Sequence, residues 1–431
     1  MDENRPARSH SIARLAAASA VGTTLEWYDF TIYNIMAALV FNVVFFPKYD
    51  PMVGTLLAFS TYAVGYFSRP MGGLLFGHLG DRLGRRFVLF ATLMLMGATT
   101  CLIGLLPSYQ QWGVWSAALL VMLRFIQGAA LGGEWAGAVL LSLEHGSDHQ
   151  RGRNGSYAQL GPACGTILGT ATVAGITLWL APASFESWGW RIPFALSALL
   201  VACGLWVRSA VEETPAFTQM KSHLETSKAP LREVVHHHLR ALLTSIGARV
   251  GPDVAYALLV VFTLTYATTI LHLARTLALT ATVIGAACNA VGIPLFASLS
   301  DRVGRRPVYA VGAVLSILWG FAYFRLMDTR QPLFIDIAVA VGLTLHASMY
   351  GPQAAFIAEQ FPARVRYAGS SMAYTLTGVV AGGVAPLLFS AIYRAYGSTV
   401  RLSLYVAVAL AVTLIALWQT RETAYAPLGE A

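Results

Sequence analysis

The chain has 431 residues, of which 56% are hydrophobic and only 12% are charged. Soluble domains carry about 25% charged residues, so this composition excludes a soluble enzyme, a disordered chain and a nucleic-acid-binding module. A helix of about 20 apolar residues crosses a bilayer, and the hydrophobic total is sufficient for twelve such helices. The net charge is +8. In a membrane protein the positions of the charged residues along the chain are more informative than this sum.

Twelve apolar segments with short polar loops follow one another along the chain, which predicts an all-α membrane protein with twelve transmembrane helices. The longest polar stretch divides them six and six. We therefore expect an N-terminal half over residues 1–208, a linker over 209–240 and a C-terminal half over 241–431. The predicted spans are 16–45, 53–76, 87–106, 113–143, 156–180, 191–208, 241–271, 277–299, 308–327, 333–357, 367–393 and 400–419.

Lys and Arg are distributed unequally between alternate loops. If the N-terminus lies inside, the inside segments hold most of the 29 Lys and Arg residues. Positive charge favours the cytoplasmic side, so we expect both termini in the cytoplasm. The N-terminus leads directly into the first apolar segment, which we expect to be an uncleaved helix and not a signal peptide. The four cysteines lie in apolar runs and form no Cys-x-x-Cys pair, which is typical of small core residues.

An internal repeat relates the two halves. Residues 81–86 read D-R-L-G-R-R after the second span, and residues 301–306 read D-R-V-G-R-R after the eighth. Glycine allows backbone conformations that other residues resist, and aspartate can cap a helix, so each copy predicts a tight turn. The second copy has Ser300 where the first has Gly80, and we expect a looser second turn. Two copies at equivalent places indicate two halves of one parallel design.

The repeated loop resembles the signature loop of the major facilitator superfamily. Further segments are similar to its metabolite:proton symporter family, and most to the shikimate-type permease branch. They include E-W-Y-D-F and the segments with R-P-x-G-G, R-x-x-Q-G, W-G-W-R-I-P-F, E-E-T-P and F-P-x-R-x-R-Y-x-G. These segments are residues 26–30, 69–73, 124–135, 188–194, 212–215 and 361–369.

The resemblance implies a fold of two six-helix halves related by pseudo-two-fold symmetry in the bacterial inner membrane. It also implies alternating access, import of a small carboxylate metabolite with protons, and action as a monomer without cofactor or nucleic acid. A proton-driven efflux antiporter and a betaine/proline-type osmolyte symporter are the alternatives. The sequence contains no H-E-x-x-H or G-x-S-x-G motif, so we expect no enzyme.

The resemblance further implies two clusters of charges that break during alternating access. We also expect Arg69, near the cytoplasmic end of the second span, to form a structural or gating pair with Glu134. The first expected cluster is Asp81, Arg85, Glu144 and Arg153; the second is Asp301, Arg305, Glu359 and Arg366.

Charged residues in the first and fourth spans are candidates for proton coupling. At 1.5 Å per residue, Asp29 and Arg124 lie about 20 Å and about 16 Å into their spans, near the middle of the bilayer. Intramembrane charges indicate function by default. We expect a pair in which Asp29 is protonated and releases Arg124 to an anionic substrate. A static buried ion pair is the alternative. Helical spacing adds Glu26 and Glu134 to the proton-coupling set.

A second set of polar residues predicts the substrate site. Arg249, Asp253 and Tyr256 share one helix face of the seventh span, and His346 and Tyr350 share one of the tenth. Arginine matches a carboxylate with two parallel hydrogen bonds, so we expect Arg249 to be the primary carboxylate ligand. Structural alternatives are an Arg249–Asp253 pair and an interhelical hydrogen bond of His346. The full candidate set is Arg124, Arg249, Asp253, Tyr33, Tyr256, Gln159, His346 and Tyr350.

Three further patterns are better explained by structure than by function. Gly161 and Pro162 partly resemble an antiporter motif, but a close-packed kink is favoured because the flanking glycines are absent. The GxxxG run from Gly128 to Gly137 indicates helix packing. The His236–His238 run could bind metal, but a solvated polar run in a loop is the simpler interpretation, and we expect no metal site.

Overall fold

The computed structural model describes residues 6–48, 51–83, 85–144, 147–209 and 230–426, and every regular element within these ranges is helical. The helices of the first part are α1 (Pro6–Leu39), α2 (Phe41–Phe45), α3 (Pro51–Leu83), α4 (Arg85–Leu105), α5 (Tyr109–Trp112), α6 (Val114–Gly132), α7 (Glu134–Glu144), η1 (Asp148–Gln150), α8 (Arg151–Gln159), α9 (Gly161–Trp179), α10 (Pro182–Ser187), η2 (Gly189–Arg191) and α11 (Ile192–Ser209).

The helices of the second part follow the predicted linker. They are α13 (Pro230–His237), α14 (Leu239–Tyr256), η3 (Ala257–Phe262), α15 (Thr263–Thr265), η4 (Tyr266–Ile270), α16 (Arg275–Val303), α17 (Arg305–Asp328), α18 (Pro332–Glu359), α19 (Arg366–Thr377), η5 (Gly378–Gly383), α20 (Ala385–Tyr396) and α21 (Thr399–Gln419).

Ten helical segments of the described residues are long and apolar enough to cross a membrane, and they coincide with the third to twelfth predicted spans. Helices α1 and α3, of 34 and 33 residues, lie at the first and second predicted spans. The all-α membrane fold predicted from the sequence is therefore confirmed.

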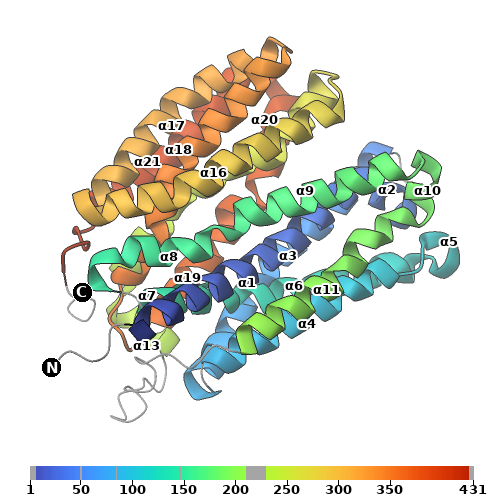
Figure 1. Ribbon diagram of the computed structural model, residues 1–431. Coiled ribbons are helices and arrows are strands. Elements are labelled where there is room, and N and C mark those ends of the chain that lie inside the picture. Colours follow the sequence, from blue (N-terminus) through green and yellow to red (C-terminus); the bar gives the residue numbers. More distant parts are fainter. Residues whose placement is uncertain (1–5, 49–50, 84, 145–146, 210–229, 427–431) are drawn as a thin grey trace.

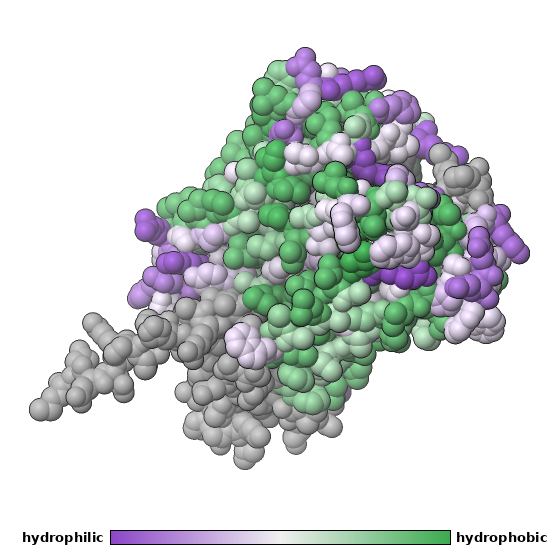
Figure 2. Space-filling view, turned by 45° about the vertical axis from the view of Figure 1, so that its right-hand side comes forward, coloured by the Kyte–Doolittle hydropathy of each residue, from purple (hydrophilic) through white to green (hydrophobic). Residues whose placement is uncertain are grey.

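The long helices run roughly parallel to one common direction. In Figure 1 those of the first part (blue to green) lie beside those of the second part (yellow to red), and α1 begins at the end of the bundle where α21 ends. In Figure 2 hydrophobic side chains cover the middle of the visible face, and hydrophilic ones gather toward its two opposite sides. This distribution suits a bilayer, in which lipid-facing side chains are apolar and the polar ends meet water.

The interior contains two large hydrophobic cores. One is built from residues of α1 to α11, with Tyr28, Phe41 and Trp190 among its largest buried side chains. The other is built mainly from α14 to α21 and also takes in α7 and α8, through residues such as Trp135 and Ala158. Helices α7 and α8 therefore pack against the second part of the chain. The domain boundaries at 208 and 241 stay a prediction.

Small residues let neighbouring helices approach closely. A side chain at Gly128 would meet the Gly65 carbonyl oxygen of α3 at 2.1 Å, and one at Gly132 would meet the Arg69 carbonyl oxygen at 1.9 Å. The predicted packing role of the GxxxG run is thus confirmed. The predicted break at Gly161 is also present, because α8 ends at Gln159 and α9 begins with Pro162 in its first turn.

The expectation of a simple loop at the histidine run is wrong. His236 and His237 form the last turn of α13, whose Val234 is buried, and Glu233 forms a 2.7 Å ion pair with Arg364. Apolar residues on one face of this short helix pack it against the bundle, which overrides the polar composition of the segment.

In the part of the chain that the structure describes, no group of three His, Cys, Asp or Glu residues could hold a metal ion.

Candidate functional site

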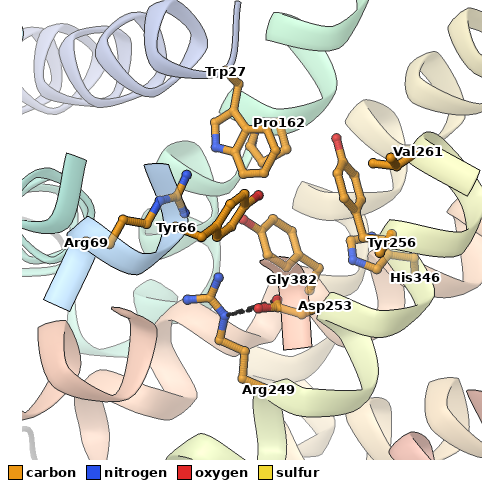
Figure 3. Close-up of a pocket in the computed structure, with 12 residues that line it drawn as sticks. Trp27, Tyr66, Arg69, Pro162, Arg249, Asp253, Tyr256, Val261, His346 and Gly382 are labelled. Atoms are coloured by element: carbon orange, nitrogen blue, oxygen red, sulfur yellow. Dashed lines mark hydrogen bonds and ion pairs between the residues drawn. The ribbon is translucent and has the colours of Figure 1, made fainter. Parts of the chain in front are cut away.

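A small pocket lies at the centre of the bundle, where both parts of the chain meet. Its free volume is only about 30 Å³, whereas ligand pockets commonly measure about 300–1,000 Å³. The helices are therefore closed around the site. The lining residues drawn in Figure 3 come from α1, α3, α9, α14, η3, α18 and η5: Trp27, Tyr66, Arg69, Pro162, Arg249, Asp253, Tyr256, Ala257, Val261, His346, Tyr350 and Gly382.

Arg249 is the most informative of these residues. Its Nε donates to both carboxylate oxygens of Asp253 one helical turn away, at 3.1 and 3.0 Å. Its guanidinium carbon lies 3.3 Å from the centroid of the Tyr374 ring, so the group is held between a carboxylate and an aromatic face. Its Nη1 is buried and has no hydrogen-bond partner among the described residues. One guanidinium donor thus remains available at the pocket.

Aromatic rings and a histidine form the opposite wall. Trp27 of α1 and Tyr256 of α14 make an edge-to-face contact with centroids 5.6 Å apart. His346 lies 5.3 Å from the Tyr256 ring and stacks on Tyr350 at 5.0 Å. The amide nitrogen of Asn289 on α16 lies 3.1 Å from His346 Nδ1, so the expected interhelical hydrogen bond of His346 is present.

Arg69 places a second guanidinium at the pocket. It lies over the Tyr66 ring at 4.1 Å and over the Phe30 ring at 4.6 Å. Figure 3 shows Arg69 and Arg249 on the same side of the pocket, with Tyr66 close to both. The sequence assigned Arg69 to gating, and the structure places it in the wall of the pocket. Its pairing with Glu134, which is itself fully buried, stays a prediction.

Asp29 and Arg124 are connected through two polar side chains. Asp29 accepts hydrogen bonds from the hydroxyls of Ser197 and Thr100, the latter at 2.7 Å. Gln127 donates from Nε2 to Thr100 at 2.6 Å and accepts from Arg124 Nη1 at 2.6 Å. The described hydrogen bonds thus form a relay between Asp29 and Arg124 through Thr100 and Gln127, which sequence reasoning did not select for the site. The proton-dependent pair of Asp29 and Arg124 stays a prediction.

Three candidate substrate ligands lie outside the pocket wall. Arg124 stacks on the ring of Tyr33 at 4.0 Å, and both side chains are fully buried in the first part of the chain. Gln159 accepts from Trp135 Nε1 at 2.8 Å and donates to the Tyr350 carbonyl at 3.1 Å. Counting along a helix gives the depth of a residue, but that count does not determine the direction in which its side chain points.

The candidate proton-coupling residue Glu26 is buried. It is close enough to the Tyr374 hydroxyl to interact with it electrostatically. Its role, like those of Asp29 and Glu134, stays a prediction.

A cluster of charges closes one end of the bundle, which we call the inner end. Arg305 Nη1 contacts Asp301 at 2.6 Å and Arg305 Nη2 contacts Glu359 at 3.2 Å. Ser300 accepts from Arg305 Nη1 at 2.9 Å. The expectation that this serine loosens the second turn stays a prediction. Gly304 has φ +103°, which only glycine adopts readily. The expected association of Asp301, Arg305 and Glu359 is therefore present.

Two other expected cluster members, Arg153 and Arg366, make contacts that the structure describes. The Arg153 side chain is exposed, and only its backbone N–H contacts the cluster, at 2.9 Å from Asp301. Arg366 donates from Nε to the carbonyls of Ala358 and Phe361, both at 3.1 Å. The side chains of Asp81, Arg85 and Glu144 lie outside the described residues.

Arg151 is the residue that sequence reasoning missed. It is buried on α8, lies 3.4 Å from Glu359, and donates from Nη2 to the carbonyls of Thr423, Ala424 and Ala426. Gly152 N–H donates to Asp301 at 2.8 Å. The start of α8 is thus tied to α16, α18 and the segment after α21. No local pattern predicts this, because the partner segment is distant in sequence and is folded back by tertiary contacts.

Known proteins with similar sequences are membrane transporters. Residues 15–248 match the family model described as Sugar (and other) transporter, and residues 253–429 match that of the Major Facilitator Superfamily. A shikimate transporter of Escherichia coli (strain K12) is 39% identical over 88% of this chain and 87% of its own length. A proline/betaine transporter of the same organism is 33% identical over 97% of this chain and 85% of its own length.

Two further similarities agree with this assignment. An inner membrane metabolite transport protein of Escherichia coli (strain K12) is 35% identical over 96% of this chain and 95% of its own length. Among solved structures, a proton:xylose symporter bound to 6-bromo-6-deoxy-D-glucose superimposes with a TM-score of 0.80 at 16% identity, over 96% of this chain and 97% of the symporter. The structural similarity establishes the shared fold.

Proposed function

We propose that this chain, which belongs to the major facilitator superfamily of transporters, is a symporter that imports a small carboxylate metabolite together with protons. Members of this superfamily are transporters and not enzymes, as expected from the sequence. The relatives support a multi-pass protein of the bacterial inner membrane. Termini in the cytoplasm, proton coupling and action as a monomer are parts of the proposal.

The observation that carries the proposal is the buried guanidinium of Arg249 at the central pocket. Asp253 engages Nε, and Nη1 remains without a partner among the described residues. An unsatisfied charged donor in a buried site is costly, and a substrate carboxylate would satisfy it. Arg69 adds a second guanidinium to the same wall, so the charged side chains that line the pocket are those of Arg69, Arg249 and Asp253.

The remaining pocket residues favour a hydroxylated or cyclic acid. Tyr256, Tyr350 and His346 supply hydroxyl and imidazole groups, and their ring faces suit a flat or cyclic carbon skeleton. The name of the shikimate transporter, the relative with 39% identity, agrees with this class of substrate. Proton coupling is assigned to Asp29, whose relay leads to Arg124. The Phe30 ring contacts both Arg124 and the pocket residue Arg69.

One alternative substrate class has its own support. Trp27, Tyr66 and Tyr256 surround the pocket together with Asp253, and aromatic faces with a carboxylate bind quaternary ammonium groups. A proline/betaine transporter is 33% identical to this chain. A betaine also carries a carboxylate, so Arg249 would serve either substrate. The two candidate functions differ in one property: a carboxylate symporter transports acids that carry no ammonium group, and a betaine symporter does not.

Reconstituted vesicles provide the test. When the external pH is lower than the internal pH, protons flow inward, and the protein should accumulate labelled shikimate or a related hydroxy acid above its external concentration. A protonophore should abolish this accumulation. Glycine betaine should compete weakly. Betaine accumulation without uptake of ammonium-free acids would establish the osmolyte alternative. Acid extrusion driven by proton entry would establish an antiporter.

The variant Arg249→Lys tests the carboxylate ligand. Lysine keeps the charge but loses the planar fork that binds two carboxylate oxygens. We expect the affinity for the transported acid to fall by roughly tenfold or more, since a hydrogen bond to a charged group contributes about 1.5–3 kcal/mol. The matched control is Arg401→Lys, because Arg401 also stacks on a tyrosine, Tyr396, but lies outside the pocket. Unchanged affinity in Arg249→Lys would overturn the assignment.

A further inference from the structure

A second and larger cavity opens between the two parts of the chain. It measures about 260 Å³ and is formed by α1, α9, η3, α15, η4 and α16. It lies toward the end at which α16 begins with Arg275, opposite the inner end where α16 reaches Asp301 and Val303. We call it the outer cleft. Its volume approaches the lower limit of common ligand pockets.

The outer cleft has one charged group and many hydroxyls. Arg275 is the only charged residue among the described residues that line it, and seven of the fourteen lining residues are threonines. Arg275 is exposed and makes no hydrogen bond or ion pair with any described residue. The carbonyl oxygen of the Asn34 side chain, also at the cleft, is buried and has no hydrogen-bond partner within the described ranges. The cleft therefore presents unused polar groups.

Two of the threonine hydroxyls, those of Thr268 and Thr282, present acceptors rather than donors to the cleft. Thr268 donates to the Leu264 carbonyl at 2.8 Å, and Thr282 donates to the Ala278 carbonyl at 2.9 Å. A hydroxyl that has donated its proton can still accept a hydrogen bond. A ligand that fits must therefore place an anion at Arg275 and hydroxyl donors at the threonines. That combination describes a hydroxylated carboxylate.

A thin partition separates the outer cleft from the central pocket. Val261 lines both spaces, and the hydroxyl of Thr166 in the cleft lies 3.2 Å from the hydroxyl of Tyr256 in the pocket. This contact joins α9 to α14 across the two parts of the chain. A ligand in the cleft would thus be one layer of side chains away from the pocket that holds Arg249.

We propose that the outer cleft is a second substrate site, which captures a hydroxylated carboxylate on Arg275 before the partition opens to Arg249. The inference rests on the proposed function, because it assumes the same class of substrate. A lone positive group in a narrow cleft concentrates anions locally and raises their rate of capture. Arg275 therefore affects the rate at which the substrate is captured. Arg249 affects the affinity of the central pocket, from which the substrate is transported.

The test uses initial rates of labelled shikimate uptake by the full chain in proteoliposomes. Arg275→Gln should lower kcat/KM by about tenfold, at the lower end of the range of electrostatic steering, and leave the maximal rate within about twofold. It should also remove most of the dependence of kcat/KM on ionic strength. Arg275→Lys, which keeps the charge, should restore much of kcat/KM. The control Arg325→Gln makes the same charge change at an exposed position outside the cleft and should have no effect.

A second pair of variants tests the hydroxyl recognition. Thr268→Val and Thr282→Val keep the side-chain shape and remove the acceptor. Together they should lower kcat/KM for shikimate at least threefold and leave that for cyclohexanecarboxylate, which lacks hydroxyls, unchanged. The inference is overturned if Arg275→Gln retains full kcat/KM, if Arg325→Gln lowers it equally, or if both acids respond alike to the threonine variants. Failure of the proposed function is distinguishable, since the unmodified protein would then transport no carboxylate.

Discussion

Asp29 is held by neutral hydroxyl groups within a buried network. Ser197 and Thr100 donate to its two oxygens, and the path continues through Gln127 to Arg124. Asp29 is linked to Arg124 only through Thr100 and Gln127. When Asp29 gains a proton, Gln127 and the Tyr33 ring still contact Arg124, so the buried arginine keeps these contacts. The network is thus suited to reversible protonation.

The variant Asp29→Asn should uncouple transport from protons. Asparagine approximates a permanently protonated aspartate, so we expect loss of pH-driven accumulation while exchange of labelled for unlabelled substrate continues. Asp148→Asn, at an exposed site in η1, is the control and should accumulate substrate normally. Full uphill transport by Asp29→Asn would exclude Asp29 as the coupling group.

At the scale of single residues, the sequence predicted one half of the central site better than the other. Arg249, Asp253 and Tyr256 lie on one face of α14 at the spacing that helix geometry requires, and all three line the pocket. Arg124 and Tyr33 were also selected for the substrate site, yet they contact each other inside the first part of the chain. Hydropathy and helical periodicity determine depth and face, whereas the rotation of a helix relative to its neighbours depends on packing.

The helices themselves were predicted closely because bilayer thickness sets their length. The predicted span 333–357 is found as α18, Pro332–Glu359. The predicted span 241–271 is broken into α14, the π-helical turns η3 and η4 and the short α15. No hydropathy pattern signals such turns, which arise from local adjustment of hydrogen bonds and often mark functional sites. Here η3 carries Val261, which lines both the central pocket and the outer cleft.

Close contact between α3 and α6 gives a prediction about stability. A side chain at Gly72 would lie 1.6 Å from the Ala129 carbonyl oxygen, so Gly72→Ala forces the two backbones apart. Overpacking of this kind costs about 1–3 kcal/mol, and we expect a lower melting temperature in detergent. Gly175→Ala is the matched control, because nothing lies within 4 Å of the added carbon in α9. Equal melting temperatures for the two variants would show that the α3–α6 contact is looser than described.

As a whole, the molecule is closed at the inner end and hollowed toward the outer end. Arg151, Asp301 and Glu359 join the two parts at the inner end, and the cavity of about 260 Å³ lies on the other side of the central pocket. Under the proposed alternating access, the inner contacts break when the outer cleft closes. Sequence reasoning found the charges of α16 to α18 from the repeat, but it could not find Arg151, whose partners are carbonyl oxygens of the segment after α21.

The variant Arg151→Gln should therefore favour the state that is open at the inner end. Arg151 joins α8 to Glu359 and to three carbonyl groups, and glutamine can replace at most part of these contacts. Breaking a buried ion pair by removing one partner is destabilising by about 3–5 kcal/mol. Under the proposed alternating access, the pair is made only while the inner end is closed. The population should shift by at least severalfold toward inner opening, since each 1.4 kcal/mol changes an equilibrium tenfold.

Cysteine modification measures this shift directly. Ala354 is buried on α18 and faces α8, where a side chain at Gly155 would meet its Cβ at 3.5 Å. In a variant without the four native cysteines, Ala354→Cys should react with a maleimide reagent at least fivefold faster when Arg151→Gln is added. Arg153→Gln, a neighbouring arginine with an exposed side chain, should leave the reaction rate unchanged. The reaction rates could instead be equal with Arg151 unchanged, with Arg151→Gln and with Arg153→Gln. The charge of Arg151 would then be removable without separating α8 from α18. That result would show that hydrophobic packing, and not Arg151, closes the inner end.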